Sequence, residues 1–154
     1  MGICLGLQLS VVEFARNVCG VADATSTEFE KPGTPFIDYL PDQNETIAKG
    51  GTLRLGHQDA VIQEGSLIHK LYGSTTINDR HRHRYEVCQD KHEILRSNGL
   101  VLSGTSHEGR LVEYIENPAC TYFVATQAHP EFKSRPGKPH PLFDGLVKAS
   151  IDSL

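Results

Sequence analysis

The chain opens with a cysteine flanked by glycines, Gly2-Ile3-Cys4-Leu5-Gly6, directly before an amphipathic segment. Two glycines permit a sharp turn from a strand into a helix, and such a turn holds its central side chain out at a strained backbone angle. After the turn, apolar residues recur at helical spacing at Leu7, Val11, Phe14, Ala15 and Val18, and Cys19-Gly20 supplies a stop. The pattern predicts a helix beginning near Leu7, with Cys4 exposed at the apex of the turn that precedes it.

The rest of the chain alternates short strand-like runs with helical runs. Strands are predicted at FIDYL (36–40), TLRLG (52–56), AVIQ (60–63), RYEVC (84–88), LVLSG (100–104), RLVEYIE (110–116) and TYFVAT (121–126). Helices are predicted at SLIHKLYG (66–73), KHEILRSNG (91–99) and PLFDGLVKASIDSL (141–154). The piece STEF (26–29) reads as part of a loop, and Gly50-Gly51 as a turn. We expect one mixed α/β domain with a central sheet.

Composition excludes several classes of function. Fifteen Lys and Arg against nineteen Asp and Glu give a net charge of −4, which argues against a general nucleic-acid or membrane-surface binder. No apolar run approaches the roughly 20 residues of a membrane span, so we expect a cytoplasmic protein. The four cysteines show no CxxC pair, and the histidines His81, His83 and His92 lack a spacing typical of zinc folds. We therefore expect reduced thiols and no metal site.

A nucleophilic cysteine needs a base, and His129-Pro130-Glu131 at the end of the TYFVAT strand offers one. In an extended stretch Glu131 projects to the same side as His129 and orients its imidazole. We expect the helix start to favour the Cys4 thiolate, and the backbone N–H of Leu5 to serve as an oxyanion donor. The alternative is a buried cysteine at a tight turn and a surface histidine beside a proline.

Together, GICLGLQ and QAHPEF resemble the two signatures of class I glutamine amidotransferases. The pieces TSTEFE, GGTLRLG, DRHRHRYEV and SRPGKPHPLFDGLVKA narrow the resemblance to the amidotransferase domain of the CTP synthase family, over nearly the whole chain. The resemblance implies an α/β fold with a central, mostly parallel sheet flanked by helices. It implies that Cys4, His129 and Glu131 form a catalytic triad that hydrolyses L-glutamine to glutamate and ammonia.

The resemblance also assigns the substrate-binding residues Leu5, Gln8, Glu28 and Arg84. A free amino acid carries an ammonium and a carboxylate, so a fixed anion such as Glu28 and a fixed cation such as Arg84 suit it. In an extended DRHRHRYEV segment, Arg80, Arg82 and Arg84 share one face, and His81 and His83 share the other. Apart from Arg84, the arginines also fit a solvated basic strand.

In this family the ammonia passes to a synthetase domain of the same parent chain, which uses ATP and magnesium to aminate UTP to CTP. The resemblance thus implies no cofactor within these residues, a synthetase domain as partner, and a homotetramer in the full-length enzyme. We expect 1–154 to be a partial amidotransferase domain that lacks the strands before Gly2, including the one leading into the turn. Without the family's glycine-rich oxyanion loop, we expect weak or no activity in isolation.

Three points stay open in the sequence. Another class I amidotransferase, such as those of GMP, anthranilate or carbamoyl phosphate synthesis, shares the Cys and His motifs. A truncated, non-catalytic relic that binds glutamine or a partner is a second alternative. Ala128 replaces the phenylalanine that is commoner before the catalytic histidine, and its effect on the pocket wall is the third open point.

Overall fold

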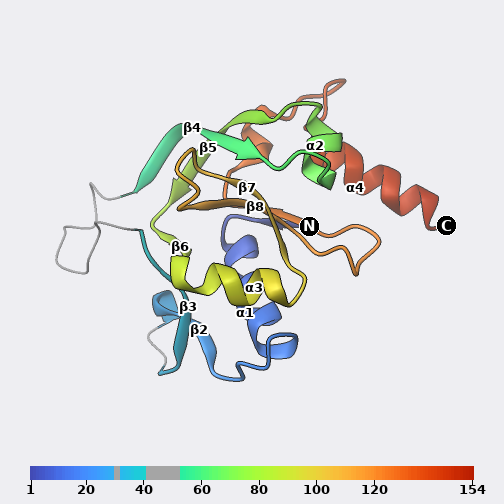
Figure 1. Cartoon of the computed structure of the whole chain (residues 1–154). Coiled ribbons are helices and arrows are strands. Elements are labelled where there is room, and N and C mark those ends of the chain that lie inside the picture. Colours follow the sequence, from blue (N-terminus) through green and yellow to red (C-terminus); the bar gives the residue numbers. More distant parts are fainter. Residues whose placement is uncertain (30–31, 41–52) are drawn as a thin grey trace.

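The computed structural model describes residues 1–29, 32–40 and 53–154 (Figure 1). Its helices are α1 (Leu5–Asn17), α2 (Leu67–Tyr72), α3 (His92–Ser97) and α4 (Pro141–Asp152), with short 3-10 turns η1 (Thr27–Phe29), η2 (Gln89–Lys91) and η3 (Pro130–Lys133). Its strands are β1 (Gly2–Ile3), β2 (Ala24–Ser26), β3 (Thr34–Tyr39), β4 (Arg54–Ile62), β5 (Thr76–His83), β6 (Tyr85–Val87), β7 (Val101–Thr105), β8 (Val112–Glu116) and β9 (Val124–Thr126).

The strands form a large sheet in the order β1-β9-β8-β7-β4-β5 and a small one in the order β2-β3-β6. The α/β class is confirmed, but the expectation of a mostly parallel sheet is wrong for the described residues. In the large sheet β1 and β9 pair in parallel, whereas the other four pairs are antiparallel. The reason is connection length, because a parallel pair needs a long crossover and β7, β8 and β9 follow one another through short turns.

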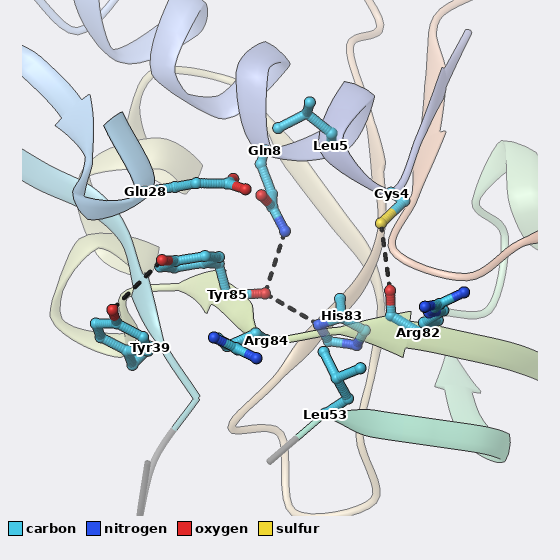
Figure 2. A pocket seen from close by; sticks show the side chains of 10 residues that line it. All are labelled: Cys4, Leu5, Gln8, Glu28, Tyr39, Leu53, Arg82, His83, Arg84 and Tyr85. Carbon is cyan, nitrogen blue, oxygen red and sulfur yellow. Dashed lines mark hydrogen bonds between the residues drawn. The ribbon is translucent and has the colours of Figure 1, made fainter. Parts of the chain in front are cut away.

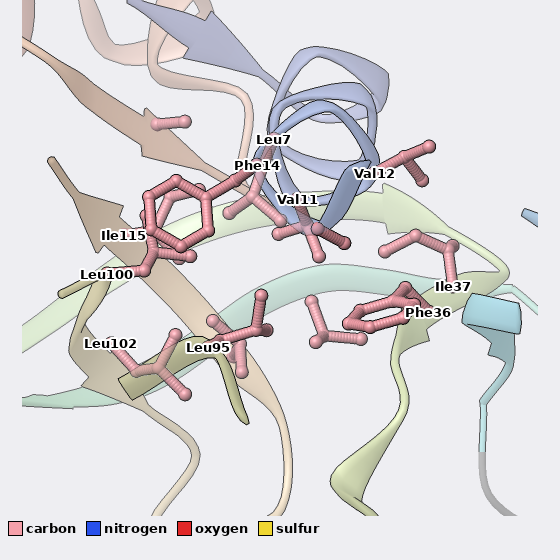
Figure 3. Packing of buried hydrophobic residues seen from close by; sticks show 14 of the residues in the cluster. Leu7, Val11, Val12, Phe14, Phe36, Ile37, Leu95, Leu100, Leu102 and Ile115 are labelled. Atoms are coloured by element: carbon pink, nitrogen blue, oxygen red, sulfur yellow. The ribbon is translucent and has the colours of Figure 1, made fainter. Parts of the chain in front are cut away.

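The large sheet separates two apolar cores. Neighbouring residues of a strand point to opposite faces, so Tyr114 and Ile115 of β8 enter different cores. Helices α1 and α3 cover the face of Ile115, where Leu7, Val11 and Leu95 are completely buried (Figure 3). Helices α2 and α4 cover the face of Tyr114. The first core fixes the orientation of α1 and therefore the turn at its start.

The predicted helices are confirmed. The apolar stripe predicted from Leu7 is buried along α1, apart from Val18, which lies just beyond the helix and is exposed. Helix α2 is closed by Gly73 in the left-handed conformation that glycine favours. The stretch read as a loop around STEF instead forms β2 and η1.

Two expectations about strands are wrong. The runs TLRLG and AVIQ are not separate strands, because Arg54–Ile62 is continuous as β4 and pairs with β5 along most of its length. A strand does lead into the cysteine turn, since β1 pairs with β9 directly before Cys4. Thr52 and the turn predicted at Gly50-Gly51 lie outside the described residues. Within those residues, no helix combines the length and the apolar character that a membrane crossing requires.

Candidate active site

Cys4 occupies the turn between β1 and α1 in a strained conformation. Its φ of 51° and ψ of −106° make it the one non-glycine residue with positive φ in the described part of the chain. Its N–H donates to the Thr126 carbonyl at 2.7 Å, and its own carbonyl accepts from Leu7 N at 3.0 Å as α1 begins. A Cβ atom at Gly2 would lie 2.8 Å from the Gly6 carbonyl carbon, so the turn requires glycine there. In this conformation the thiol reaches the Arg82 carbonyl of β5.

His129 and Glu131 lie beyond the end of β9 and contact each other. The His129 Nδ1 atom is 2.6 Å from Glu131 Oε1. Glu131 was expected in an extended stretch, but it lies in η3, whose first residue is Pro130. Proline suits the first position of a helical turn because its ring presets φ and its missing N–H needs no partner there. The expected contact therefore forms by a different backbone route.

The curl of the large sheet brings Cys4 and His129 to the same strand, β5. Strands β1 and β5 stand at opposite edges in the strand order, yet Cys4 Sγ donates to the Arg82 carbonyl at 3.8 Å. On the same strand, the Arg80 carbonyl accepts from His129 N at 2.8 Å. Two residues along a strand span about 6.6 Å, so Cys4 and His129 contact nearby carbonyls of β5.

A pocket of about 690 Å³ opens beside Cys4 (Figure 2). All four predicted substrate-binding residues line it, together with Cys4 itself: Leu5 and Gln8 from α1, Glu28 from η1 and Arg84 between β5 and β6. No substrate-binding role is predicted from the sequence for the remaining lining residues, Tyr39, Leu53, Arg82, His83 and Tyr85. Of these, His83 is predicted to lie on the face of the strand opposite the arginines. Burial alternates along β5 as expected, but at the end of the strand residues of both faces, Arg82 and His83, line the pocket.

Gln8 is almost wholly buried and joined to a second glutamine. Its Nε2 lies 3.2 Å from the Tyr85 carbonyl and 3.2 Å from Gln127 Oε1. Gln127 Nε2 in turn lies 3.7 Å from Cys4 Sγ. Gln127 is not predicted as a site residue from the sequence, although it stands within QAHPEF. The sequence feature that could have identified it is its position directly after the apolar strand. There a polar side chain lies on the same face as the strand residue two positions earlier, Ala125.

The pKa of the Cys4 thiol is raised, contrary to the expectation drawn from the helix start. Burial is the largest cause, because it penalises the charged thiolate, and the negative charges of Glu28 and Glu131 act in the same direction. Hydrogen bonds from Leu5 N–H and from the Gln127 side chain lower the pKa but do not outweigh burial. The neutral thiol of Cys4 is therefore favoured, and its ionisation requires a group that accepts the proton.

A buried polar chain lies beneath the pocket. His83 Nδ1 is 2.9 Å from the Tyr85 carbonyl, and His83 Nε2 is 3.1 Å from His81 Nδ1. His81 Nε2 lies 3.6 Å from Glu113, whose other oxygen is 2.5 Å from Arg54 Nη1. Burial lowers the pKa of His81 to about 3 and that of His83 to about 4, so both rings are neutral at pH 7. Within the described ranges no three His, Cys, Asp or Glu side chains are grouped as metal ligands would be.

A buried aspartate holds η3 behind the site. The Lys133 Nζ atom lies 3.0 Å from Asp79 Oδ1, and Tyr72 and Tyr114 donate their hydroxyls to Asp79 Oδ2 at 2.9 and 2.8 Å. His140 Nε2 lies 3.4 Å from the same oxygen. Lys133 and Glu131 both lie in η3, so the ion pair between Lys133 and Asp79 anchors the segment that carries Glu131 to β5.

The chain resembles known proteins over nearly its whole length. Residues 1–149 match the family Glutamine amidotransferase class-I. The CTP synthase of Methanocaldococcus jannaschii is 60% identical over 98% of this chain, and that of Staphylococcus aureus strain NCTC 8325 is 52% identical over 97%. The chain spans 28% of the length of each of these relatives.

Solved structures similar to this one include two from different organisms. The glutaminase domain of Trypanosoma brucei CTPS with bound acivicin has a TM-score of 0.89 and 38% identity, covering 98% of this chain and 59% of that one. A putative GMP synthase protein from Thermoplasma acidophilum has a TM-score of 0.60 at 14% identity, covering 99% and 57%, and shares the fold alone. With its family signature matched over almost its whole length, the chain belongs to the class I glutamine amidotransferases.

Proposed function

We propose that this chain hydrolyses the side-chain amide of L-glutamine through Cys4, His129 and Glu131, as the glutaminase part of a CTP synthase. The observation that carries the proposal is the convergence of a strained cysteine, a histidine paired with a carboxylate at 2.6 Å, and a pocket lined by Glu28 and Arg84. Similarity to CTP synthases over nearly all of the chain supports the choice of parent enzyme.

Substrate binding uses opposite charges. The Arg84 guanidinium pairs with the α-carboxylate of glutamine through two parallel hydrogen bonds, and the Glu28 carboxylate accepts from the α-ammonium. No contact within the described residues engages Gln8 Oε1, although the Gln8 amide nitrogen is occupied. That oxygen is therefore available to accept a hydrogen bond from the substrate.

Acylation begins when His129 takes the thiol proton and the Cys4 sulfur attacks the amide carbon. The Leu5 N–H stabilises the developing oxyanion. The C–N bond then breaks, the nitrogen leaves as ammonia with the proton from His129, and a glutamyl thioester remains. Glu131 keeps Nδ1 of His129 protonated, so that Nε2 carries the lone pair that accepts the proton.

Deacylation reverses the proton path. His129 takes a proton from a water molecule, the hydroxide attacks the thioester carbon, and the C–S bond breaks to release glutamate. The thiol proton returns from His129. In the parent enzyme, a synthetase part that binds ATP and magnesium uses the ammonia to aminate UTP, a cytoplasmic reaction, and the full-length enzyme assembles as a homotetramer.

Two experiments test the proposal. A glutamine-like electrophile such as acivicin should form a covalent adduct on the peptide containing Cys4, with the mass of acivicin less the HCl lost when the sulfur displaces its chloride. The Cys4→Ala variant should show no adduct, whereas Cys120→Ala, a change at an exposed cysteine, should still be labelled at Cys4. Absence of the Cys4 adduct would favour a relic that binds without chemistry.

The parent activity is tested by a hybrid in which this chain replaces the matching segment of the Methanocaldococcus jannaschii CTP synthase. The hybrid should form CTP with either glutamine or ammonium chloride. The Cys4→Ala hybrid should form CTP with ammonium chloride only. A hybrid that uses ammonia but never glutamine would contradict the proposal.

A further inference from the structure

Gln127 places an amide next to the nucleophile. The residue is completely buried between β9 and His129, and its backbone N–H donates to the Glu113 carbonyl at 2.9 Å. Its side-chain Nε2 is 3.7 Å from Cys4 Sγ, within range of a hydrogen bond to sulfur. A buried amide in contact with a reacting atom requires an explanation, because apolar side chains fill such space at lower cost.

The orientation of this amide follows from its neighbours. The Tyr85 carbonyl can only accept, so the Gln8 group 3.2 Å from it is the NH₂ group. The same NH₂ group faces Gln127 at 3.2 Å and requires an acceptor there, which is Gln127 Oε1. Gln127 therefore turns its own NH₂ group toward Cys4, as a donor.

The backbone carbonyl of Tyr85 determines the orientation of the first amide in this chain of hydrogen bonds, that of Gln8. The Tyr85 carbonyl also accepts from the ring of His83 at 2.9 Å, and His83 is buried and neutral. Two donors from different elements thus hold the carbonyl that orients Gln8. The direction of every hydrogen bond from His83 to Cys4 follows from the Tyr85 carbonyl, which can only accept.

The donor matters when the thiol ionises. The thiol S–H points to the Arg82 carbonyl at 3.8 Å, and after the proton leaves, that carbonyl oxygen repels the thiolate. The donors that remain at the sulfur are Leu5 N–H and the Gln127 amide. The charged and titratable groups around the sulfur and its pocket are Glu28 in η1, Tyr39 in β3, Arg82 and His83 in β5, Arg84 directly after β5, Tyr85 in β6, His129 directly before η3 and Glu131 in η3.

We propose that Gln127 is a catalytic residue that donates a hydrogen bond to the Cys4 thiolate, with Gln8 acting as the positioning residue that orients it. The role deepens the proposed glutaminase function and rests on it for its use in turnover. The lowering effect of the Gln127 hydrogen bond on the pKa of the Cys4 thiol agrees with this role.

The test measures the thiol without any substrate. Iodoacetamide alkylation of Cys4 is followed between pH 5 and 10 by peptide mass spectrometry in wild type and four variants. Gln127→Leu should raise the apparent pKa by about one unit, which makes alkylation about tenfold slower at neutral pH. Gln127→Glu should raise it further, because a carboxylate repels the thiolate, and Gln8→Met should raise it less. Gln63→Glu, the same change at an exposed site, should leave it unchanged.

Cys19 reports on folding in the same samples, because it packs against the core and contacts the Ile94 carbonyl. An unchanged or lower pKa of Cys4 in Gln127→Leu and Gln127→Glu, with Cys19 alkylated at the wild-type rate, overturns the role of Gln127. If both Gln127 variants also expose Cys19, the comparison of Gln8→Met with wild type decides, and an unchanged pKa there overturns it. Absence of glutamine hydrolysis in wild type would instead overturn the proposed function, since alkylation needs no glutamine.

Discussion

The Nδ1 atom of His129 lies 2.6 Å from Oε1 of Glu131, with one proline between the two residues. The contact fixes the imidazole tautomer only while position 131 is an acceptor. In Glu131→Gln the amide can turn its NH₂ group toward Nδ1 and select the wrong tautomer. We expect the kcat for glutamine hydrolysis to fall by about 10²–10⁴-fold with little change in KM.

The measurement is steady-state release of glutamate from the hybrid CTP synthase that carries this chain. Glu108→Gln is the matched control, because Glu108 is an exposed glutamate whose nearest cation is 3.8 Å away. Equal losses in both variants, or a kcat that survives in Glu131→Gln, would rule out the orienting role.

Replacing Arg84 by lysine keeps the positive charge but changes the geometry of the hydrogen-bond donors. In the proposed binding mode, Arg84→Lys loses the two parallel hydrogen bonds to the substrate carboxylate but keeps the cation. We expect KM for glutamine to rise about 10- to 100-fold while kcat changes little, since a lost charged hydrogen bond weakens ground state and transition state alike. Arg96→Lys on the exposed side of α3 should behave as wild type. A fall in kcat at constant KM would place Arg84 outside substrate binding.

Asp79 stabilises the folded state as an anion. Burial alone would raise its pKa, but hydrogen bonds from His140, Tyr114, Lys133 and Tyr72 outweigh burial and hold the pKa well below the usual value. The stabilisation is therefore present above the unfolded pKa of about 3.9 and is lost as the pH falls below it.

Asp79→Asn should lower the free energy of unfolding by about 2–3 kcal/mol at pH 7, and by less at pH 3. Urea denaturation at the two pH values measures this difference. Asp59→Asn, at an exposed aspartate on β4, is the control and should cost under about 1 kcal/mol. A loss in Asp79→Asn that is the same at pH 3 as at pH 7 would contradict the role of the charge.

The pKa of Glu86 is shifted in the opposite direction to that of Asp79. Burial is the main reason that its pKa rises to about 8, and the charge of Glu113 adds to it. Its Oε1 accepts from Val87 N at 2.8 Å and from Val112 N at 3.2 Å, contacts that a glutamine oxygen can reproduce. A raised acid pKa contributes stability below the unfolded value of about 4.3, and that stability is lost as the pH rises through about 8.

Glu86→Gln should therefore have little effect on stability at pH 5 and should raise the free energy of unfolding at pH 9 by at least about 2 kcal/mol relative to wild type. Denaturant unfolding at both pH values checks the prediction. Glu64→Gln, an exposed change, serves as the control. Equal stability of Glu86→Gln and wild type at pH 9 would show that Glu86 ionises without penalty.

The sequence predicted the parts of this molecule that follow from local pattern. Periodicity located α1 and α4, and the glycines around Cys4 predicted its turn, because these features depend on neighbours within a few residues. Strand direction in the large sheet was mispredicted, since pairing depends on which strands meet in space. The raised pKa of Cys4 was mispredicted for a similar reason: the helix start is local, whereas the burial that dominates comes from distant elements.

In the site, too, some residues were predicted from the sequence, whereas features that depend on contacts between distant residues were not. Leu5, Gln8, Glu28 and Arg84 were assigned from resemblance, and they line one pocket with Cys4. Gln127 was missed because its importance lies in a contact with a residue 123 positions away. The contact between Glu131 and His129 was predicted correctly, but the backbone conformation behind it was not. Pro130 begins a 3-10 turn instead of continuing the strand.

The curl that brings β5 to the far edge of its own sheet has a consequence for biosynthesis. Cys4 leaves the ribosome long before His129, so the two residues can both contact carbonyls of β5 only after residue 129 has been made. A partly made chain therefore lacks this arrangement. The same closure lets His129 N–H occupy the Arg80 carbonyl, so that one backbone acceptor on the outer strand is already used and is less available to recruit a strand from another molecule.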